Sequence, residues 1–157
     1  MENLTIVKVG GKIVEEEASL KQLLADFSSI EGKKLLVHGG GRSATRMAER
    51  LGIATQMVEG RRITDTPMLE VVTMVYGGLV NKTIVARLQA LGINALGMTG
   101  ADMNIMLSDR RPVKTIDYGW AAQRTPVCRS ARRGQRWTWC RFFPALPPPV
   151  QQRKAPR

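Results

Sequence analysis

The sequence predicts an α/β fold built on a mainly parallel β-sheet. Two short apolar runs, Leu4–Val9 and Lys34–His38, have the length and composition of buried strands. Residues 16–30 between them repeat apolar side chains at helical spacing, so the order of elements is strand, helix, strand. This order favours parallel strands with ligand sites at their carboxyl ends.

One further helix and two further strands are expected along the chain. Residues 43–51 have the pattern of a helix that Gly52 terminates. Residues 54–58 and 95–98 are short apolar runs with the composition of strands. The alternation of strand and helix therefore continues through the first hundred residues.

A long apolar helical pattern begins at Thr66-Pro67. Threonine is a favoured N-cap, and proline is favoured at the first helical position. Gly77-Gly78 is expected to interrupt the helix, and residues 79–91 resume its pattern.

A β-hairpin is predicted after the last of these elements. Residues 105–107 and 113–116 would be its strands, with the polar turn 108–112 between them. Asp102 precedes the hairpin, and we interpret it as a turn residue rather than a functional carboxylate.

Two glycine runs follow the first two predicted strands. Gly39, Gly40 and Gly41 stand between a strand and a helix, where backbone N–H groups can approach a phosphate or carboxylate closely. Gly10 and Gly11 follow the other strand and would lie at the same edge of the sheet. Either run alone is compatible with an ordinary turn. Their convergence favours an anion-binding site.

Three basic residues accompany these loops. Lys8 lies inside a predicted buried strand, so it must either reach an anion or extend to the surface at the strand end. Arg61 and Arg62 precede a helix and are either a solvated charge pair or a carboxylate site. The second reading uses the planar fork of the guanidinium.

Several other kinds of site are excluded by the composition. His38 is the only histidine, so neither a histidine-based triad nor a histidine-rich metal site can be assembled. A lone histidine at a strand end is more typical of a hydrogen-bonded structural residue. Neither GxxxxGK[ST] nor GxGxxG occurs. Cys128 and Cys140 lack zinc-ligand spacing, and we expect reduced thiols and no metal centre.

The net charge of +11 is concentrated at one end of the chain. Residues 1–120 hold 15 Lys/Arg and 13 Asp/Glu, whereas 121–157 hold nine Lys/Arg, no acidic residue and six of the eight prolines. Basic and aromatic residues are interleaved there, as in some single-strand nucleic-acid binders, but no recognisable module accompanies them. We therefore expect no nucleic-acid partner.

The N-terminal residues lack the basic and apolar blocks of a secretory signal. In addition, no apolar run approaches the roughly 20 residues of a membrane span. We expect a cytoplasmic protein without a membrane partner.

Seven short blocks occur in an order that resembles one family. The blocks are Val7-Lys8-Val9-Gly10-Gly11, Val37-His38-Gly39-Gly40-Gly41, Gly60-Arg61-Arg62-Ile63-Thr64-Asp65, Leu69-Glu70-Val71-Val72, Val80-Asn81-Lys82, Gly97-Met98-Thr99-Gly100-Ala101-Asp102 and Asp117-Tyr118-Gly119. Residues 1–119 resemble the N-terminal domain of the amino-acid kinase family. The Gly-x-Arg-x-Thr block is most similar to the acetylglutamate kinase branch. The resemblance implies a three-layer sandwich and a homo-oligomer.

The resemblance also implies a reaction. The γ-phosphoryl group of ATP would pass in line to the side-chain carboxylate of N-acetyl-L-glutamate or a related N-acylglutamate, in arginine biosynthesis. Mg²⁺ would be carried by the nucleotide. Lys8 would be catalytic and neutralise charge on the phosphoryl group, and Gly10 and Gly11 would bind phosphate. Gly39–Gly41 and Arg62 would bind the substrate, with Arg62 on its α-carboxylate.

The resemblance ends near Trp120. Relatives of this type continue with a nucleotide-binding half and a second catalytic lysine, which the remaining residues do not match. We expect an acylamino-acid-binding domain over 1–119 and an irregular, basic, proline-rich tail over 120–157. We interpret the tail as a frameshifted reading of the gene. The alternatives for the chain are an inactive substrate-binding or dimerisation fragment, and a basic nucleic-acid-binding protein acting through its tail.

Overall fold

The structure is a computed structural model that describes residues 3–104, 108–110, 113, 115–120, 122–124 and 138–142. Its centre is a four-stranded sheet in the order β1-β2-β8-β5, in which every neighbouring pair is parallel. The strands are β1 (Leu4–Val9), β2 (Lys33–His38), β5 (Ala95–Thr99) and β8 (Thr138–Phe142). The predicted parallel α/β fold is confirmed.

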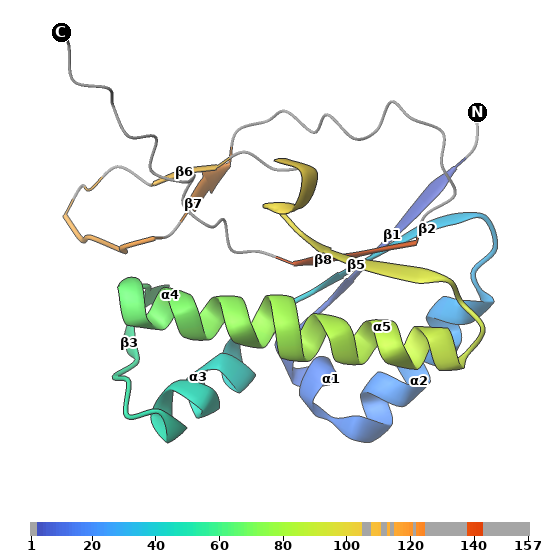
Figure 1. Cartoon of the computed structure of the whole chain (residues 1–157), viewed down its shortest axis with the longest axis horizontal. Coiled ribbons are helices and arrows are strands. Elements are labelled where there is room, and N and C mark those ends of the chain that lie inside the picture. Colours follow the sequence, from blue (N-terminus) through green and yellow to red (C-terminus); the bar gives the residue numbers. More distant parts are fainter. Residues whose placement is uncertain are drawn as a thin grey trace, which may run out of the picture.

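Five α-helices lie on one side of this sheet (Figure 1). They are α1 (Gly11–Glu15), α2 (Glu17–Ser29), α3 (Gly41–Arg50), α4 (Thr66–Val72) and α5 (Asn81–Ala90). A π-helical stretch, Thr73–Val80, joins α4 to α5 without a break. The predicted interruption at Gly77-Gly78 is therefore wrong, because burial of this helix against the sheet outweighs the weak helix propensity of two glycines.

The core lies between the sheet and the helices. In β2 the side chains alternate, so Leu36 is fully buried toward the helices while Leu35 on the other face is partly exposed. Leu24 and Phe27 of α2 are each 1% exposed, which confirms the apolar face predicted from their spacing. The strand-to-helix order thus places the carboxyl ends of β1 and β2 beside the N-termini of α1 and α3.

The continuous helix Thr66–Ala90 has 25 residues. By length and composition alone it is apolar enough to cross a membrane, a test that core helices of globular proteins also pass. Met68, Val71, Val75 and Ile84 on this helix are at most 1% exposed and belong to the core. Its apolar character is therefore explained by its central position over the sheet.

β1 is an edge strand of the sheet rather than a buried one. Leu4 and Ile6 are 53% and 60% exposed, because their face of the sheet is not covered by α1–α5. The prediction of a fully buried strand is wrong for these two residues, while Val9 at the strand end is buried. In the part of the chain that the structure describes, the second outer helical layer of the predicted sandwich is not found.

The tail contributes two strands to the described structure. β7 (Ala122–Arg124) pairs antiparallel with β6 (Ser108–Arg110), and β8 lies between β2 and β5. The prediction of an irregular tail is wrong at these residues, and apart from Trp120 the rest of the tail lies outside the described residues. Long-range pairing satisfies backbone donors and acceptors in a way that local composition does not reveal.

The predicted hairpin after β5 is also wrong. Ser108–Arg110, expected in its turn, forms a strand that pairs with β7 instead. Residues 105–107, one of its predicted strands, lie outside the described residues.

A separate antiparallel hairpin carries Arg62 to the site. It consists of β3 (Gln56–Val58) and β4 (Arg61–Ile63), joined at Glu59 and Gly60, whose φ angles are +50° and +72°. Two positive φ angles are typical of a type I′ turn. The predicted strand at 54–58 thus exists, but outside the parallel sheet.

The backbone of residues 118–120 is fixed against the residue after this hairpin. Thr64 N–H donates to the Tyr118 carbonyl at 3.1 Å, and Trp120 N–H donates to the Thr64 carbonyl at 2.7 Å. Gly119 has φ +66°, and a Cβ there would overlap the Thr64 carbonyl. Glycine is therefore required at this contact.

Candidate functional site

Two glycine loops meet at the carboxyl end of the sheet. A Cβ on Gly11 would lie 3.7 Å from the Gly41 nitrogen and 3.9 Å from the Gly40 nitrogen. A Cβ on Gly39 would lie 3.8 Å from the Gly11 nitrogen. Three backbone nitrogens from two loops are therefore gathered in one place. The convergence of the loops predicted from the sequence is confirmed.

The second loop continues directly into α3. The Gly40 carbonyl accepts the first helical hydrogen bond, from Ala44 N–H at 2.9 Å, and no side chain caps this end of the helix. The first N–H groups of an α-helix have no acceptor within the helix, and the helix dipole makes this end positive. This helix end is therefore chemically suited to an oxyanion.

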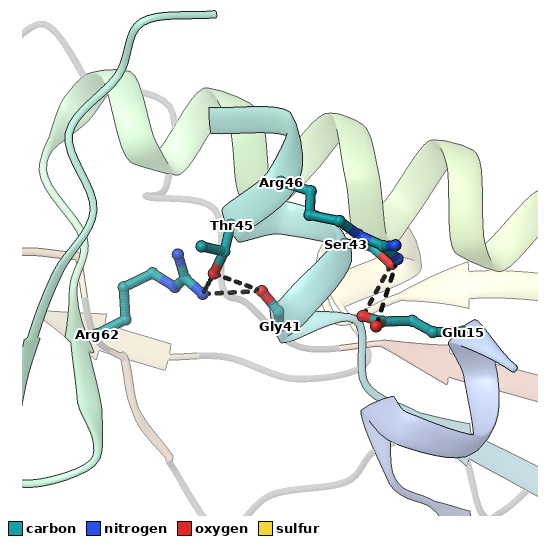
Figure 2. Close-up of polar contacts among 6 residues, drawn as sticks. All are labelled: Glu15, Gly41, Ser43, Thr45, Arg46 and Arg62. Carbon is teal, nitrogen blue, oxygen red and sulfur yellow. Dashed lines mark hydrogen bonds and ion pairs between the residues drawn. The ribbon is translucent and has the colours of Figure 1, made fainter. Parts of the chain in front are cut away.

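Arg62 reaches the same helix end from β4 (Figure 2). Its Nη2 donates to the Gly41 carbonyl at 2.8 Å and to the Thr45 hydroxyl at 2.8 Å. Nη1 contacts the sulfur of Met68 at 3.8 Å. The guanidinium is thus held beside the glycine loop, as its predicted binding role requires, while Arg61 is exposed.

Lys8 lies at the same end of the sheet, two residues before Gly10. Its side chain is exposed, and none of the described residues makes a hydrogen bond or ion pair with its ammonium group. Lys8 is in register with Val37, whereas Val9 is in register with His38. Because side chains alternate along a strand, Lys8 lies on the sheet face away from the helices. The structure therefore brings together the glycines and Arg62, whereas the Lys8 ammonium makes no hydrogen bond or ion pair with any of the described residues there.

An acidic residue flanks Gly41 on the side away from Arg62 (Figure 2). Glu15, the last residue of α1, accepts a hydrogen bond from the Ser43 hydroxyl at 3.1 Å and pairs with Arg46 at 3.3 Å. Its side chain is only 12% exposed. Sequence reasoning missed this contact, which joins α1 to α3.

Tyr76 is a second residue that sequence reasoning missed. A Cβ on Gly40 would lie 2.8 Å from Cδ1 and 3.0 Å from Cε1 of its ring, and a Cβ on Gly41 would lie 3.4 Å from its hydroxyl oxygen. Burial raises the pKa of Tyr76, while the nearby Arg62 charge opposes this shift. A tyrosine in an apolar helical pattern carries no sequence signal for such a contact.

His38 joins the glycine loop to α5. The amide nitrogen of Asn81 lies 3.3 Å from Nε2, and Nδ1 lies 3.0 Å from the Gly39 carbonyl. Because the amide nitrogen is a donor, Nε2 accepts and Nδ1–H donates to Gly39, which defines a neutral tautomer. Burial lowers the pKa of His38. A hydrogen-bonded structural histidine is what its isolated position in the sequence predicted.

Two further expectations concern carboxylates and metals. Asp102 accepts hydrogen bonds from the backbone N–H and the hydroxyl of Thr99, so it is a turn residue as predicted. Over the described ranges, no three His, Cys, Asp or Glu side chains are arranged so that they could hold a metal ion.

The family model of the amino acid kinase family matches residues 3–134. The chain belongs to this family. Its match extends beyond the predicted domain boundary at residue 119, which stays a prediction.

Curated relatives match a shorter part of the chain. Acetylglutamate kinases of Phocaeicola vulgatus and Bacteroides thetaiotaomicron are 73% and 70% identical to it over 119 residues, and each alignment covers 76% of this chain and 46% of the relative. That of Methanopyrus kandleri is 39% identical over 108 residues, covering 69% of this chain and 41% of the relative. The chain thus spans about half the length of the curated relatives it matches.

Solved structures share the fold. The N-acetylglutamate synthase from Neisseria gonorrhoeae complexed with coenzyme A and N-acetyl-glutamate has a TM-score of 0.67 at 22% identity, covering 88% of this chain and 33% of that one. The protein smu.665 from Streptococcus mutans UA159 has a TM-score of 0.65 at 18% identity, covering 80% and 51%. At these identities the similarity concerns the fold alone.

Proposed function

We propose that the chain forms the acylamino-acid-binding half of an acetylglutamate kinase site. The observation that carries the proposal is the meeting of Gly11 with Gly39–Gly41 beside the guanidinium of Arg62. Backbone N–H donors at a helix N-terminus and a fixed guanidinium are suited to binding the carboxylates of an acylamino acid. Similarity to curated acetylglutamate kinases over 76% of the chain supports this substrate class.

In this proposal each site residue has a separate role. Arg62 binds the α-carboxylate of N-acetyl-L-glutamate or a related N-acylglutamate, and the N–H groups of Gly39–Gly41 bind the side-chain carboxylate. An oxygen of that carboxylate attacks the γ-phosphorus of ATP, and the bond to ADP breaks. Gly10 and Gly11 bind the transferred phosphoryl group. The Lys8 ammonium neutralises the charge on its oxygens, as in other phosphoryl transfers.

ATP supplies the phosphoryl group, and Mg²⁺ enters with its phosphates rather than through a protein metal site. Apart from the residues that contact the transferred phosphoryl group, we assign none of the described residues to the nucleotide. We also propose that the protein is located in the cytoplasm and forms a homo-oligomer. Sedimentation of the purified chain tests the oligomeric state.

A second candidate function is substrate binding or dimerisation without catalysis. It is favoured by the observation that the structure gathers the residues proposed to bind the substrate's carboxylates, Gly39–Gly41 and Arg62, and that none of the described residues makes a hydrogen bond or ion pair with the ammonium group of Lys8. Loss of one charge-stabilising donor typically costs about 10²–10³-fold in rate, so a chain lacking several of them would have no measurable turnover.

Titration calorimetry on the full chain separates these functions. An acetylglutamate kinase binds both N-acetyl-L-glutamate and MgATP and releases ADP when both are present. Binding of N-acetyl-L-glutamate without MgATP binding supports the inactive fragment. No binding of N-acetyl-L-glutamate would refute both the kinase and the substrate-binding fragment, and sedimentation would then decide whether the chain dimerises. Salt-sensitive binding to single-stranded DNA that vanishes on removal of residues 121–157 would support the nucleic-acid alternative.

The origin of the tail is a separate proposal. Charge, proline content and cysteine content all change near Trp120, which supports a shift of reading frame there. Translation of the other two frames of the DNA should then restore alternating strand and helix patterns. Two frames without such patterns would refute the shift.

A further inference from the structure

The helix that crosses the sheet contacts the glycine loop at two points. Tyr76 lies against Gly40 and Gly41 with its ring and hydroxyl. Asn81, which is completely buried, donates to His38, and His38 in turn donates to the Gly39 carbonyl. Three successive glycines are thus contacted, directly or through one side chain, by a single helical segment.

The π-helical stretch makes these two contacts compatible. The backbone N–H of Asn81 donates to the carbonyl of Tyr76, five residues earlier, which is the hydrogen bond that defines a π-helix. In an ordinary α-helix of 3.6 residues per turn, two residues five apart point about 140° away from each other. The wider turn of the π-helical stretch brings Tyr76 and Asn81 closer to the same face of the helix. π-Helical turns often occur at functional sites.

The loop has little means of holding its own conformation. Glycine has the largest backbone freedom of any residue, and three in succession must lose it before the Gly40 and Gly41 nitrogens can lie beside Gly11. The Tyr76 ring occupies the space into which a side chain at Gly40 would project. Removal of the ring would leave an empty volume beside the loop and restore its freedom.

We propose that Tyr76 is a positioning residue of the anion site, which holds the Gly39–Gly41 backbone so that its N–H donors face Gly11. Asn81 and His38 form the second contact that holds the loop, through the Gly39 carbonyl. The inference rests on the proposed function for the identity of the ligand, but not for the effect on the loop itself. Tyr76 is not a catalytic residue in this account, because it acts through the loop.

Three variants of the full chain test this role. Tyr76→Leu removes the ring, and Tyr76→Phe keeps it. Phe27→Leu is the control, because Phe27 is a buried aromatic residue of α2 in the same core whose ring lies beside the Lys34 ammonium, whereas Tyr76 is partly buried and packs against that core.

The first readout is hydrogen exchange of the Ala44 amide, which donates to the Gly40 carbonyl at the loop–helix junction. A loss of global stability by itself accelerates hydrogen exchange. We expect Tyr76→Leu to accelerate the exchange of the Ala44 amide about tenfold or more beyond that contribution. Tyr76→Phe and Phe27→Leu should show no such excess. Equal excess acceleration in Tyr76→Leu and Phe27→Leu, or none in either, would overturn the inference.

The second readout is the affinity for N-acetyl-L-glutamate, measured by calorimetry. We expect about a tenfold loss in Tyr76→Leu, since small displacements of positioned groups can cost up to about 100-fold, and less than about a threefold change in the other two variants. If the wild-type chain does not bind this compound, the proposed function fails, and the Ala44 exchange still decides the inference. A wild-type affinity retained in Tyr76→Leu would overturn it.

Discussion

Two cations of this protein stand at opposite kinds of helix end. The Lys34 ammonium donates to the carbonyls of Phe27, Ser28 and Ile30 at 3.0, 2.8 and 2.8 Å, at the C-terminus of α2. Positive charge is favourable there, because the last carbonyls of a helix are unsatisfied and its dipole is negative. Burial lowers the pKa of Lys34. This lysine is a structural cap.

Arg62 stands where a cation is electrostatically unfavourable. It lies at the N-terminus of α3, the positive end of that helix, and Glu15 on the other side of Gly41 offsets only part of this charge. A bound carboxylate would relieve the repulsion. The comparison teaches that Lys34 stabilises the helix end at which it lies, whereas the position of Arg62 is explained by the proposed binding of a carboxylate.

The largest expected effect belongs to the structural cation. Lys34→Met should lower the free energy of unfolding by about 2–3 kcal/mol, because three carbonyls at the end of α2 lose their donor. Affinity for N-acetyl-L-glutamate should remain within about twofold. Urea denaturation and calorimetry measure the two quantities. Lys21→Met, at an exposed position of α2, is the control, and an equal loss of stability in both variants would remove the distinction.

Gly40→Ala, in the glycine loop beside Arg62, should lower the stability of the folded protein. The new methyl group would lie 2.8 Å from the Tyr76 ring, and such overpacking costs about 1–3 kcal/mol. The control is Gly78→Ala, because no atom lies within 4 Å of a Cβ added at Gly78. This substitution is expected to leave the stability unchanged or to raise it by up to about 1 kcal/mol. Thermal unfolding of both variants checks this, and a stable Gly40→Ala protein would contradict the packing.

The pH dependence of stability should contain a smaller contribution from His38. Its pKa is lowered in the folded protein, so between that value and the unfolded value near 6.5 the unfolded chain binds more protons. Stability should therefore fall as the pH drops below about 6.5. Urea denaturation across this range should show a flatter profile for His38→Asn. If His38→Asn leaves the pH profile unchanged, another group is responsible for the pH dependence of stability.

The smallest effect is expected at the exposed end of the Glu15 contact. Arg46 is 66% exposed, and ion pairs of this kind contribute about 0–1 kcal/mol. Arg46→Ala should change the unfolding free energy by less than about 0.5 kcal/mol, and salt should reduce even this difference. A loss of several kcal/mol in urea denaturation would show that Glu15 depends on Arg46.

Local sequence patterns predicted the parts of the site whose positions follow directly from the order of strands and helices along the chain. The glycines after β1 and β2 lie at one sheet edge because parallel strands leave no other place for them, and Arg62 follows from a recognisable block. Tyr76 could not be predicted, since its role depends on a π-helical turn and on Gly40 from another element.

The position of β8 could not be predicted for a related reason. Thr138–Phe142 lies far along the chain from both of its neighbours, β2 and β5. Their pairing depends on satisfying backbone groups across the sheet, whereas composition describes only the surroundings of each residue along the chain. The same limitation explains the wrong hairpin after β5.

The central claim is that the Gly39–Gly41 loop and Arg62 together bind the two carboxylates of an acylamino acid. Its most direct test is calorimetric titration of N-acetyl-L-glutamate into Arg62→Met, with Arg61→Met as the neighbouring control. The account predicts about a tenfold or greater loss of affinity for Arg62→Met at unchanged stability, and wild-type affinity for Arg61→Met. Equal affinity in the two variants would contradict it.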